Sequence, residues 1–319
     1  MSGTTKDVGG WTKEIGGSGE FRRQNSAFRD RVTADGSSGY PAAAGRYHLY
    51  VSLACPWASR ALLVRKLKGL EDAIGLTIVD PYRDEAGWAF RAGDVTPPGE
   101  ADPLHGWSFL SEAYEASDPG FDGRVTVPVL WDTETGRIVN NESSEVIRML
   151  NAEFDAFATR PELDLYPEDL RDEIDALNER IYDEVNNGVY RAGFATSQEA
   201  YEDAVTTLFR ALEWLEGILA ERRYLTGDRI TEADWRLFMT LVRFDPVYVG
   251  HFKCNLKRIV DLPNLWAYTR DLYQQPGVAE TVNLDHIKHH YYATHPSINP
   301  TGIVPLGPEI DWDEPHGRG

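Results

Sequence analysis

One cysteine stands where a strand pattern gives way to a helix pattern. Residues 47–52 alternate between apolar and polar side chains, as a half-buried strand does, and apolar residues recur at helical spacing from Leu62 to Leu70. Cys55 and Pro56 lie between the two patterns. The positive end of a helix stabilises a thiolate, and proline fits the first helical position because its missing N–H would be unpaired there. We therefore predict a reactive thiol at a helix N-terminus; the alternative is a buried structural cysteine.

The spacing around the two cysteines limits their chemistry. Position 58 is alanine, so Cys55 has no partner at Cys-x-x-Cys spacing and cannot resolve its own oxidised form. A lone thiol must instead form a mixed disulfide with a small thiol and be released by a second one. Cys254 lies outside any strand–turn–helix pattern, and we expect a partly buried structural thiol there. Neither cysteine has metal-ligand spacing, so we expect no metal and no disulfide framework.

The composition is that of an ordinary folded protein with two domains. The 319 residues exceed the usual single-domain size, and 42% hydrophobic content supplies apolar residues for two cores. The net charge of −19 argues against nucleic acid as a partner, because phosphate binding needs clustered Lys and Arg. No stretch approaches the ~18 apolar residues of a membrane helix. The first six residues lack a signal-peptide pattern, so we expect a cytoplasmic protein.

The elements that would position the thiol follow one another in an informative order. Residues 76–81 predict a second strand, parallel to the first because a helix connects them. Residues 125–132 and 137–140 predict an antiparallel hairpin. Pro128 cannot donate to the ladder, so it must lie at an edge, at a bulge or in a cis turn. A helix follows, with Asn141 as its expected N-cap. This order resembles the thioredoxin fold.

The remaining segments complete an α/β domain followed by an all-α domain. Residues 1–45, rich in Gly, Ser and charge, predict an extended arm over the surface. The thioredoxin-like domain spans 46–155 and contains an irregular insertion, 82–123, whose many aromatic residues favour a folded flap near a site. Residues 160–295 carry apolar stripes at helical spacing and predict an all-helical domain on the substrate side. Residues 296–319 form a C-terminal tail.

This layout, with a capping box from Thr231 to Asp234 opening a helix of the second domain, is that of the cytosolic glutathione transferases. Within them, the chain resembles the glutathionyl-hydroquinone reductases, the Xi class. The resemblance covers nearly the whole chain. It rests on five motifs in order: CPWA at 55–58, NES at 141–143, FDPVYVGHFKCN at 244–255, HIKHHYY at 286–292 and TGIVPLGP at 301–308.

The resemblance implies the reduction of glutathionyl-hydroquinones, in which Cys55 attacks the sulfur of a thioether-linked glutathione and expels the hydroquinone. A second glutathione then releases the enzyme, so glutathione is a co-substrate. Glu142 and Ser143, at a predicted helix start, could take the ammonium and the carboxylate of the γ-glutamyl end. The implied glutathione-binding residues are Trp88, Arg124, Val127, Pro128, Glu142 and Ser143.

On the hydroquinone side, the resemblance points to Tyr190, His290 and Tyr291, whose phenol and imidazole groups could donate a proton to the ring. Which of His290, Tyr291 and Tyr292 faces the substrate stays open, because adjacent helical residues point about 100° apart. A homodimer is also implied, with the tail after Pro296 as a candidate interface element.

Two other functions and two other thiols stay open at this point. A conjugating glutathione transferase would activate glutathione with a hydroxyl near the first strand, and Ser52 and Ser59 are misplaced for that role. A non-catalytic thioredoxin-like binding module would have an unreactive Cys55. The small thiol could be γ-glutamylcysteine or mycothiol rather than glutathione. The natural hydroquinone is not legible in the sequence.

Overall fold

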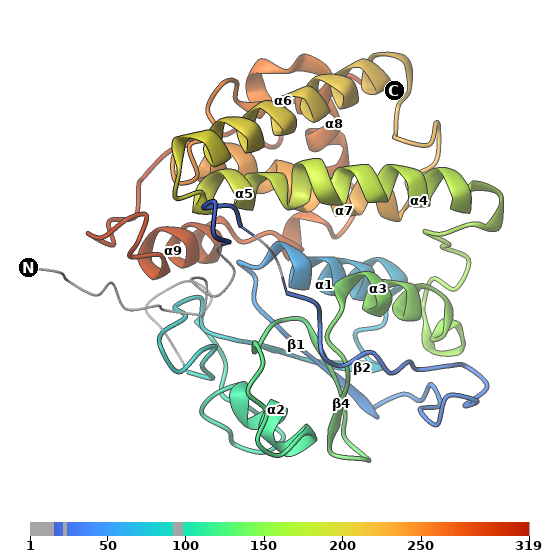
Figure 1. Cartoon of the computed structure of the whole chain (residues 1–319). Coiled ribbons are helices and arrows are strands. Elements are labelled where there is room, and N and C mark those ends of the chain that lie inside the picture. The colour runs from blue at the N-terminus through green and yellow to red at the C-terminus, as the bar shows by residue number, and fades with distance from the viewer. Residues whose placement is uncertain (1–15, 22–23, 92–97, 319) are drawn as a thin grey trace, which may run out of the picture.

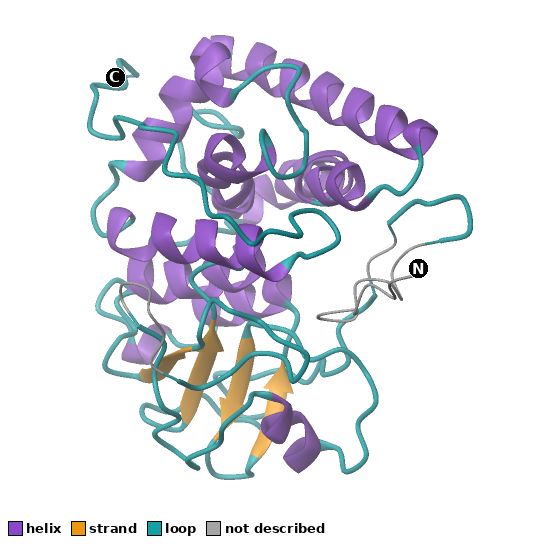
Figure 2. Cartoon of the chain, turned by 90° about the vertical axis from the view of Figure 1, so that its left-hand side faces the viewer, coloured by secondary structure: helices purple, strands orange, loops and turns teal. Residues whose placement is uncertain are grey.

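A computed structural model describes residues 16–21, 24–91 and 98–318. The strands and the all-helical part occupy opposite ends of the molecule, and helices α1 (Pro56–Lys68) and α3 (Ser143–Ala152) lie between them (Figure 1). Figure 2 shows the same division by element type, with strands confined to one end. The predicted fold class, a thioredoxin-like α/β half followed by an all-α half, is confirmed.

The sheet has four strands in the order β2-β1-β3-β4. β1 (Tyr47–Val51) pairs parallel with β2 (Ile74–Ile78) and antiparallel with β3 (Val129–Asp132), which pairs antiparallel with β4 (Arg137–Asn140). The parallel pair and the hairpin were both predicted. β2 begins two residues earlier than expected, and β3 begins only after Pro128, which therefore leaves the ladder intact.

The expectation of a half-buried first strand was wrong. All five residues of β1 are buried, because β1 is a central strand with both faces covered. Its polar side chains are satisfied inside: His48 Nε2 lies 2.7 Å from the Thr77 hydroxyl, and the Tyr50 hydroxyl donates to Asp102 at 2.9 Å. The alternation therefore reflects buried hydrogen bonds rather than exposure to water.

The helix after β4 begins one residue later than predicted. Its N-cap is Glu142, whose carboxylate accepts from the backbone N–H of Ser144, and not Asn141. Asn141 is occupied elsewhere: its side-chain oxygen accepts from the backbone N–H of Phe28, and its amide donates to the hydroxyl of Tyr114. The cap therefore falls to the neighbouring carboxylate.

The insertion is more ordered than its pattern suggested. Within 98–123 it forms a short helix, α2 (Ser111–Ser117). Trp88 and Phe90, which lie before that range, and Tyr114 within it are buried. Residues 92–97 of the predicted flap lie outside the described residues. The aromatic side chains therefore attach the insertion to the core, and one of them, Trp88, also reaches the site described below.

The second half is helical, as its apolar stripes predicted. Its helices are α4 (Arg171–Arg180), α5 (Gly188–Phe194), α6 (Gln198–Glu221), α7 (Glu232–Arg243), α8 (Pro263–Tyr273) and α9 (Leu284–Thr294), with π-helical turns at Ile181–Asn186 and Phe244–Tyr248. The predicted capping box is present at the start of α7: Thr231 and Asp234 exchange hydrogen bonds between side chain and backbone. None of the described helices is long and apolar enough to cross a membrane.

The described parts of both terminal segments are fastened to the body. In the arm, Phe21 and Val32 are buried, although residues 1–15 and 22–23 lie outside the described residues. In the tail, Trp312 stacks on Tyr273 with ring centroids 5.0 Å apart, and Arg270 donates to the backbone carbonyl of Glu314 at 3.2 Å.

Candidate active site

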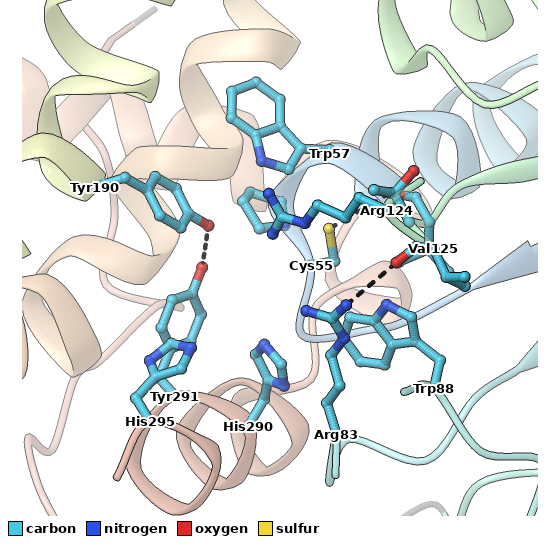
Figure 3. A pocket seen from close by; sticks show the side chains of 13 residues that line it. Cys55, Trp57, Arg83, Trp88, Arg124, Val125, Tyr190, His290, Tyr291 and His295 are labelled. Carbon is cyan, nitrogen blue, oxygen red and sulfur yellow. Dashed lines mark hydrogen bonds between the residues drawn. The ribbon is translucent and has the colours of Figure 1, made fainter. Parts of the chain in front are cut away.

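Cys55 occupies the N-cap position of α1, with Pro56 as the first helical residue, as predicted. Its side chain is partly exposed, and its Sγ lies 3.8 Å from the backbone carbonyl oxygen of Val127. The following turn is closed by the backbone N–H of Ser59, which donates to the Cys55 carbonyl at 3.0 Å. Figure 3 shows the sulfur pointing into a pocket between the two halves of the chain.

Two pockets meet beside this sulfur and share four lining residues, Trp57, Arg124, Thr126 and Val127. We call them the polar pocket and the aromatic pocket. The polar pocket encloses about 590 Å³ of empty volume and the aromatic pocket about 430 Å³, part of each open to solvent. Further polar-pocket residues include Asn25, Ser26, Pro128, Glu142 and Ser143. Cys55, Arg83, Trp88, Tyr190, His290, Tyr291 and His295 line the aromatic pocket.

An ionised carboxylate dominates the polar pocket. Burial tends to raise the pKa of Glu142, but hydrogen bonds from the Ser144 backbone N–H and the Ser26 hydroxyl (2.9 Å) outweigh it and lower that pKa. Ser143 is the first residue of α3, where backbone N–H groups are free of helical partners. Its oxygen accepts from the buried Arg60 guanidinium at 3.4 Å, which leaves its own O–H able to donate. A carboxylate and an anion-binding helix end therefore stand side by side.

The polar pocket also presents backbone beside the sulfur. The Val127–Pro128 peptide bond is cis, one of the three possibilities that the sequence left open. Val127 lies before β3 and outside its paired register, so its backbone faces the pocket rather than a neighbouring strand. Arg124 lines both pockets, and its side chain extends between Trp57 and Cys55 (Figure 3).

The aromatic pocket contains a chain of phenol groups. The hydroxyls of Tyr190 and Tyr291 lie 2.5 Å apart (Figure 3). Behind the pocket wall, the hydroxyl of the fully buried Tyr248 lies 3.1 Å from that of Tyr291. Burial raises the pKa of Tyr291 and of Tyr248 well above the ordinary value. These phenols are therefore protonated at neutral pH and can act as hydrogen-bond donors.

His290 has a fixed orientation and a defined tautomer. Its Nδ1 lies 2.8 Å from the backbone carbonyl of Pro81, and since a carbonyl only accepts, we assign the proton to Nδ1. The ring stacks on Trp88 with centroids 5.0 Å apart. Burial lowers the pKa of His290 to about 4, so the imidazole is neutral at pH 7 and Nε2 carries a lone pair.

The side chains at 290–292 of α9 differ in whether they line the aromatic pocket. His290 and Tyr291 line the aromatic pocket, whereas Tyr292 does not. The hydroxyl of Tyr292 donates to the Pro246 carbonyl at 3.3 Å, away from Cys55. All the other residues that the resemblance pointed to reach one or both pockets.

Several pocket residues escaped the sequence analysis. Arg83 donates to the carbonyl of Val125 at 3.3 Å and lies over the ring of Trp88, and His295 closes the far side of the aromatic pocket (Figure 3). Ser26 brings the N-terminal arm into the polar pocket. A basic residue five positions after the end of the second strand could have indicated Arg83, but nothing in the pattern linked the arm to a site more than 110 residues away.

Cys254 is more enclosed than expected. It is fully buried, and burial raises the pKa of its thiol. Its Sγ contacts the backbone carbonyl of Phe252 at 3.8 Å within the helical half. The expected burial is therefore complete rather than partial, and the structural role of this thiol stays a prediction.

Family models match both halves of the chain. The model of the glutathione S-transferase N-terminal domain matches residues 54–153, and that of the C-terminal domain matches residues 198–271. The chain is 56% identical over 313 residues to the glutathionyl-hydroquinone reductase YqjG of Escherichia coli, covering 96% of this chain and 94% of that protein. It is 52% identical over 308 residues to the glutathionyl-hydroquinone reductase PcpF of Sphingobium chlorophenolicum, covering 97% and 95%.

Solved structures agree with these matches. The glutathione-bound structure of YqjG superimposes with a TM-score of 0.89 over 92% of this chain and 96% of that chain. A Xi-class glutathione transferase from Natrialba magadii, 52% identical, superimposes with a TM-score of 0.89 over 94% and 95%. With full-length matches at these identities, the chain belongs to the glutathionyl-hydroquinone reductases, the Xi class of the glutathione transferases.

Proposed function

We propose that this protein reduces glutathionyl-hydroquinones to hydroquinones, with Cys55 as the nucleophile and glutathione as co-substrate. One observation carries the proposal: a partly exposed thiol at a helix N-terminus stands where a polar pocket meets an aromatic one. A glutathionyl-hydroquinone joins a charged tripeptide to an aromatic ring through sulfur. Its tripeptide suits the polar pocket, its ring suits the aromatic pocket, and its sulfur would lie at Cys55. The names of the relatives YqjG and PcpF support the same activity.

The first step transfers the glutathionyl sulfur to the enzyme. The Cys55 thiolate attacks that sulfur, an S–S bond forms, and the bond between sulfur and the aromatic carbon breaks. The electron pair of the broken bond stays on the ring carbon, which takes up a proton. The hydroquinone leaves, and Cys55 remains in a mixed disulfide with glutathione.

The polar pocket would hold the tripeptide during this step. The Glu142 carboxylate can accept from the γ-glutamyl ammonium, while Ser143 and the α3 N-terminus can donate to the adjacent carboxylate. The backbone of Val127, before the cis Pro128, can pair with the cysteinyl backbone. Arg124 can take a carboxylate, and Trp88 can pack over the ligand. This arrangement would align the glutathionyl sulfur with Cys55.

The aromatic pocket would supply the proton. Tyr190 and Tyr291 are donors within one hydrogen-bonded pair, and a phenol can protonate a developing carbanion. His290 has a different role in this proposal, because its Nδ1 proton is already donated to the Pro81 carbonyl in a hydrogen bond. Its Nε2 can accept from a hydroquinone hydroxyl and orient the ring. The proton that reaches carbon therefore comes from a tyrosine rather than from the imidazole.

A second glutathione must complete the cycle. Its thiolate attacks the glutathionyl sulfur of the mixed disulfide, which releases the Cys55 thiolate and glutathione disulfide. Neither alternative thiol position serves instead: residue 58 is a buried alanine, and Cys254 is buried in the helical half. Overall, one glutathionyl-hydroquinone and one glutathione give one hydroquinone and one glutathione disulfide.

Intact-mass analysis tests the proposal. Incubation with glutathione disulfide should give one glutathionyl adduct in the wild type and in Cys254→Ala, and none in Cys55→Ser. Cys55→Ser should also lose reductase activity, and full activity in that variant would overturn the proposal. Disulfides of γ-glutamylcysteine and mycothiol, tested in turn, identify the preferred thiol by their adduct rates.

Neither serine near the first strand is placed to activate glutathione for a conjugating activity. Ser59 is buried, and its hydroxyl donates to the Cys55 carbonyl at 3.0 Å while accepting from Arg243 at 2.8 Å. Ser52 is buried and accepts from the backbone N–H of Ala54 at 3.2 Å. Conjugation of chlorodinitrobenzene should therefore be slow. A fast rate that persists in Cys55→Ser would favour the conjugating alternative.

We further propose that the protein works as a cytoplasmic homodimer in which the tail takes part. Ile303 and Leu306 in the tail are exposed, Leu306 by 99%, which suits burial against a partner. Light scattering should give twice the chain mass, and Leu306→Ser should weaken the association. A monomeric wild type would contradict this part of the proposal.

A further inference from the structure

Arg243 lies directly behind the turn that carries Cys55, although it belongs to the helical half. It is the last residue of α7, and only 1% of its side chain is exposed. Its Nε donates to the backbone carbonyl of Ala54 at 3.0 Å, and its Nη2 donates to that of Leu53 at 3.1 Å. The same Nη2 lies 2.8 Å from the hydroxyl of Ser59. One guanidinium thus holds both residues that precede the thiol.

The charge of this guanidinium has no carboxylate partner among the described residues. Its third nitrogen, Nη1, donates to the backbone carbonyl of Met239 at 2.8 Å, so every nitrogen ends on a neutral acceptor. Burying a cation without an anion is costly, and hydrogen bonds to carbonyls offset only part of that cost. The arrangement is therefore expensive for folding alone, and a negative charge formed nearby would relieve it.

Titratable groups lie near Arg243 on both sides. Cys55 directly follows Ala54, whose carbonyl Arg243 holds, while the π-helical turn after α7 carries Tyr248 and α9 carries Tyr291 and the neutral His290. Burial raises the pKa of both tyrosines, and the Arg243 charge opposes that rise. The Arg243 guanidinium therefore acts on the phenols by its charge and on the thiol side through its hydrogen bonds to the backbone.

We propose that Arg243 is a positioning residue whose buried charge stabilises the Cys55 thiolate and whose hydrogen bonds fix the turn that carries it. The inference rests on the proposed role of Cys55 as nucleophile. Because the arginine is supplied by α7, the thiol reaches full reactivity only when the helical half is packed against the thioredoxin-like half. A structural tie between the two halves is the competing explanation, and it predicts no effect on the sulfur itself.

The chain offers a matched control in Arg65. This arginine is also buried, and it donates to the backbone carbonyls of Ile74 at 2.8 Å and Glu71 at 3.0 Å. It lies in the last turn of α1, at the opposite end from Cys55. Arg65→Met should therefore lower stability as a buried arginine loss does, without changing the thiol.

The test measures sulfur reactivity directly. The rate of Cys55 alkylation by iodoacetamide is followed from pH 5 to 9 in a Cys254→Ala background, with folding checked by circular dichroism. Arg243→Met should move the midpoint of the profile upward by about one pH unit and slow alkylation at pH 6 about tenfold. Arg243→Lys, which keeps the charge, and Arg65→Met should stay near the wild-type profile. Should Arg243→Met fail to fold, Arg243→Gln takes its place.

Two outcomes would overturn the inference. One is a folded Arg243→Met or Arg243→Gln whose profile superimposes on the wild type; the other is an Arg243→Lys profile shifted as far as the neutral variants. Since alkylation requires no turnover, either result leaves the proposed reductase activity untouched. That activity fails instead if Cys55→Ser retains it.

Discussion

The polar and aromatic pockets meet at one sulfur but are constructed differently. The polar pocket takes its charged side chains, Glu142 and Arg124, from the thioredoxin-like half, and Ser26 of the arm and Tyr182 of the helical half also line it. The aromatic pocket assembles Trp88 from the insertion, Tyr190 from α5 and Tyr291 from α9. The charged groups of the polar pocket are therefore supplied by one half of the chain, whereas the aromatic pocket depends on how distant segments pack.

This difference separates two jobs that a single site could have combined. A carboxylate and a helix N-terminus bind by charge and tolerate small shifts. Proton delivery from a phenol requires contact at hydrogen-bond distance from the ring. Variants of the aromatic pocket should therefore affect turnover, and variants of the polar pocket should affect binding of the glutathionyl part of the substrate.

Replacing a phenol should give the largest effect. Tyr291→Phe removes the middle hydroxyl of the chain, and we expect kcat for a glutathionyl-hydroquinone to fall about 100-fold. Glutathionylation of Cys55 by glutathione disulfide should keep its wild-type rate, because it needs no proton on carbon. Tyr47→Phe, which loses a hydroxyl bonded to the Pro41 carbonyl outside both pockets, is the control. Equal loss in both assays would break the division between the pockets.

Neutralising the carboxylate should have a smaller and different effect. Glu142→Gln keeps an oxygen for the helix cap but removes the charge for the γ-glutamyl ammonium. We expect the KM for the glutathionyl-hydroquinone to rise about tenfold with little change in kcat. Glu145→Gln, in the same helical turn but bonded to Arg29, provides the control in steady-state kinetics. A pure kcat effect for Glu142→Gln would contradict the assignment.

The two pockets should contribute differently to the pH dependence of the free energy of unfolding. The pKa of His290 is about 4 in the folded protein, below the unfolded value of about 6.5, so its contribution is present above pH 6.5 and is lost as pH falls toward 4. Between pH 7 and 5, burying this neutral ring should cost about 1–2 kcal/mol of unfolding free energy. Glu142 stays charged over the same range because its pKa is lowered. Urea unfolding of wild type and His290→Gln at both pH values measures the difference, and an identical pH dependence would refute it.

A change outside both pockets should have the smallest effect. Cys254→Ala removes one buried sulfur, and we expect a loss of about 1 kcal/mol of stability with unchanged kcat and KM. Thermal unfolding and steady-state assays check this together. A fall in kcat larger than the loss of folded protein explains would contradict this prediction and would assign Cys254 a role in the reaction.

The sequence could predict the parts of the site that depend on neighbours in the chain. Cys55 at the start of α1 follows from local pattern and turn chemistry, and Pro128 inside an apolar run indicated an unusual backbone there. The choice of Glu142 over Asn141 as helix cap could not be predicted, because it depends on Phe28 and Tyr114 claiming the asparagine. The fold class followed from the order of elements.

Contacts between residues far apart in the sequence could not be predicted from the sequence pattern. Nothing local distinguishes Tyr291 from Tyr292, since only the packing of α9 decides which side chain enters the pocket. In the sequence Arg243 is indistinguishable from any other arginine of a helix, yet the carbonyls that it binds, those of Leu53 and Ala54, lie about 190 residues earlier in the chain. The boundaries set at 46–155 and 160–295 remain predictions.

The N-terminal arm has a consequence for the order in which the site forms during synthesis. Phe21 stacks on Phe194 with centroids 5.5 Å apart, and Ser26 donates to Glu142, so residues made early contact residues made more than a hundred positions later. At ordinary translation rates the interval between Phe21 and Phe194 is roughly 10–30 s. The arm is thus made well before the residues that it contacts. Until those contacts form, a nascent chain can hold a folded sheet and a thiol but lacks one wall of its polar pocket.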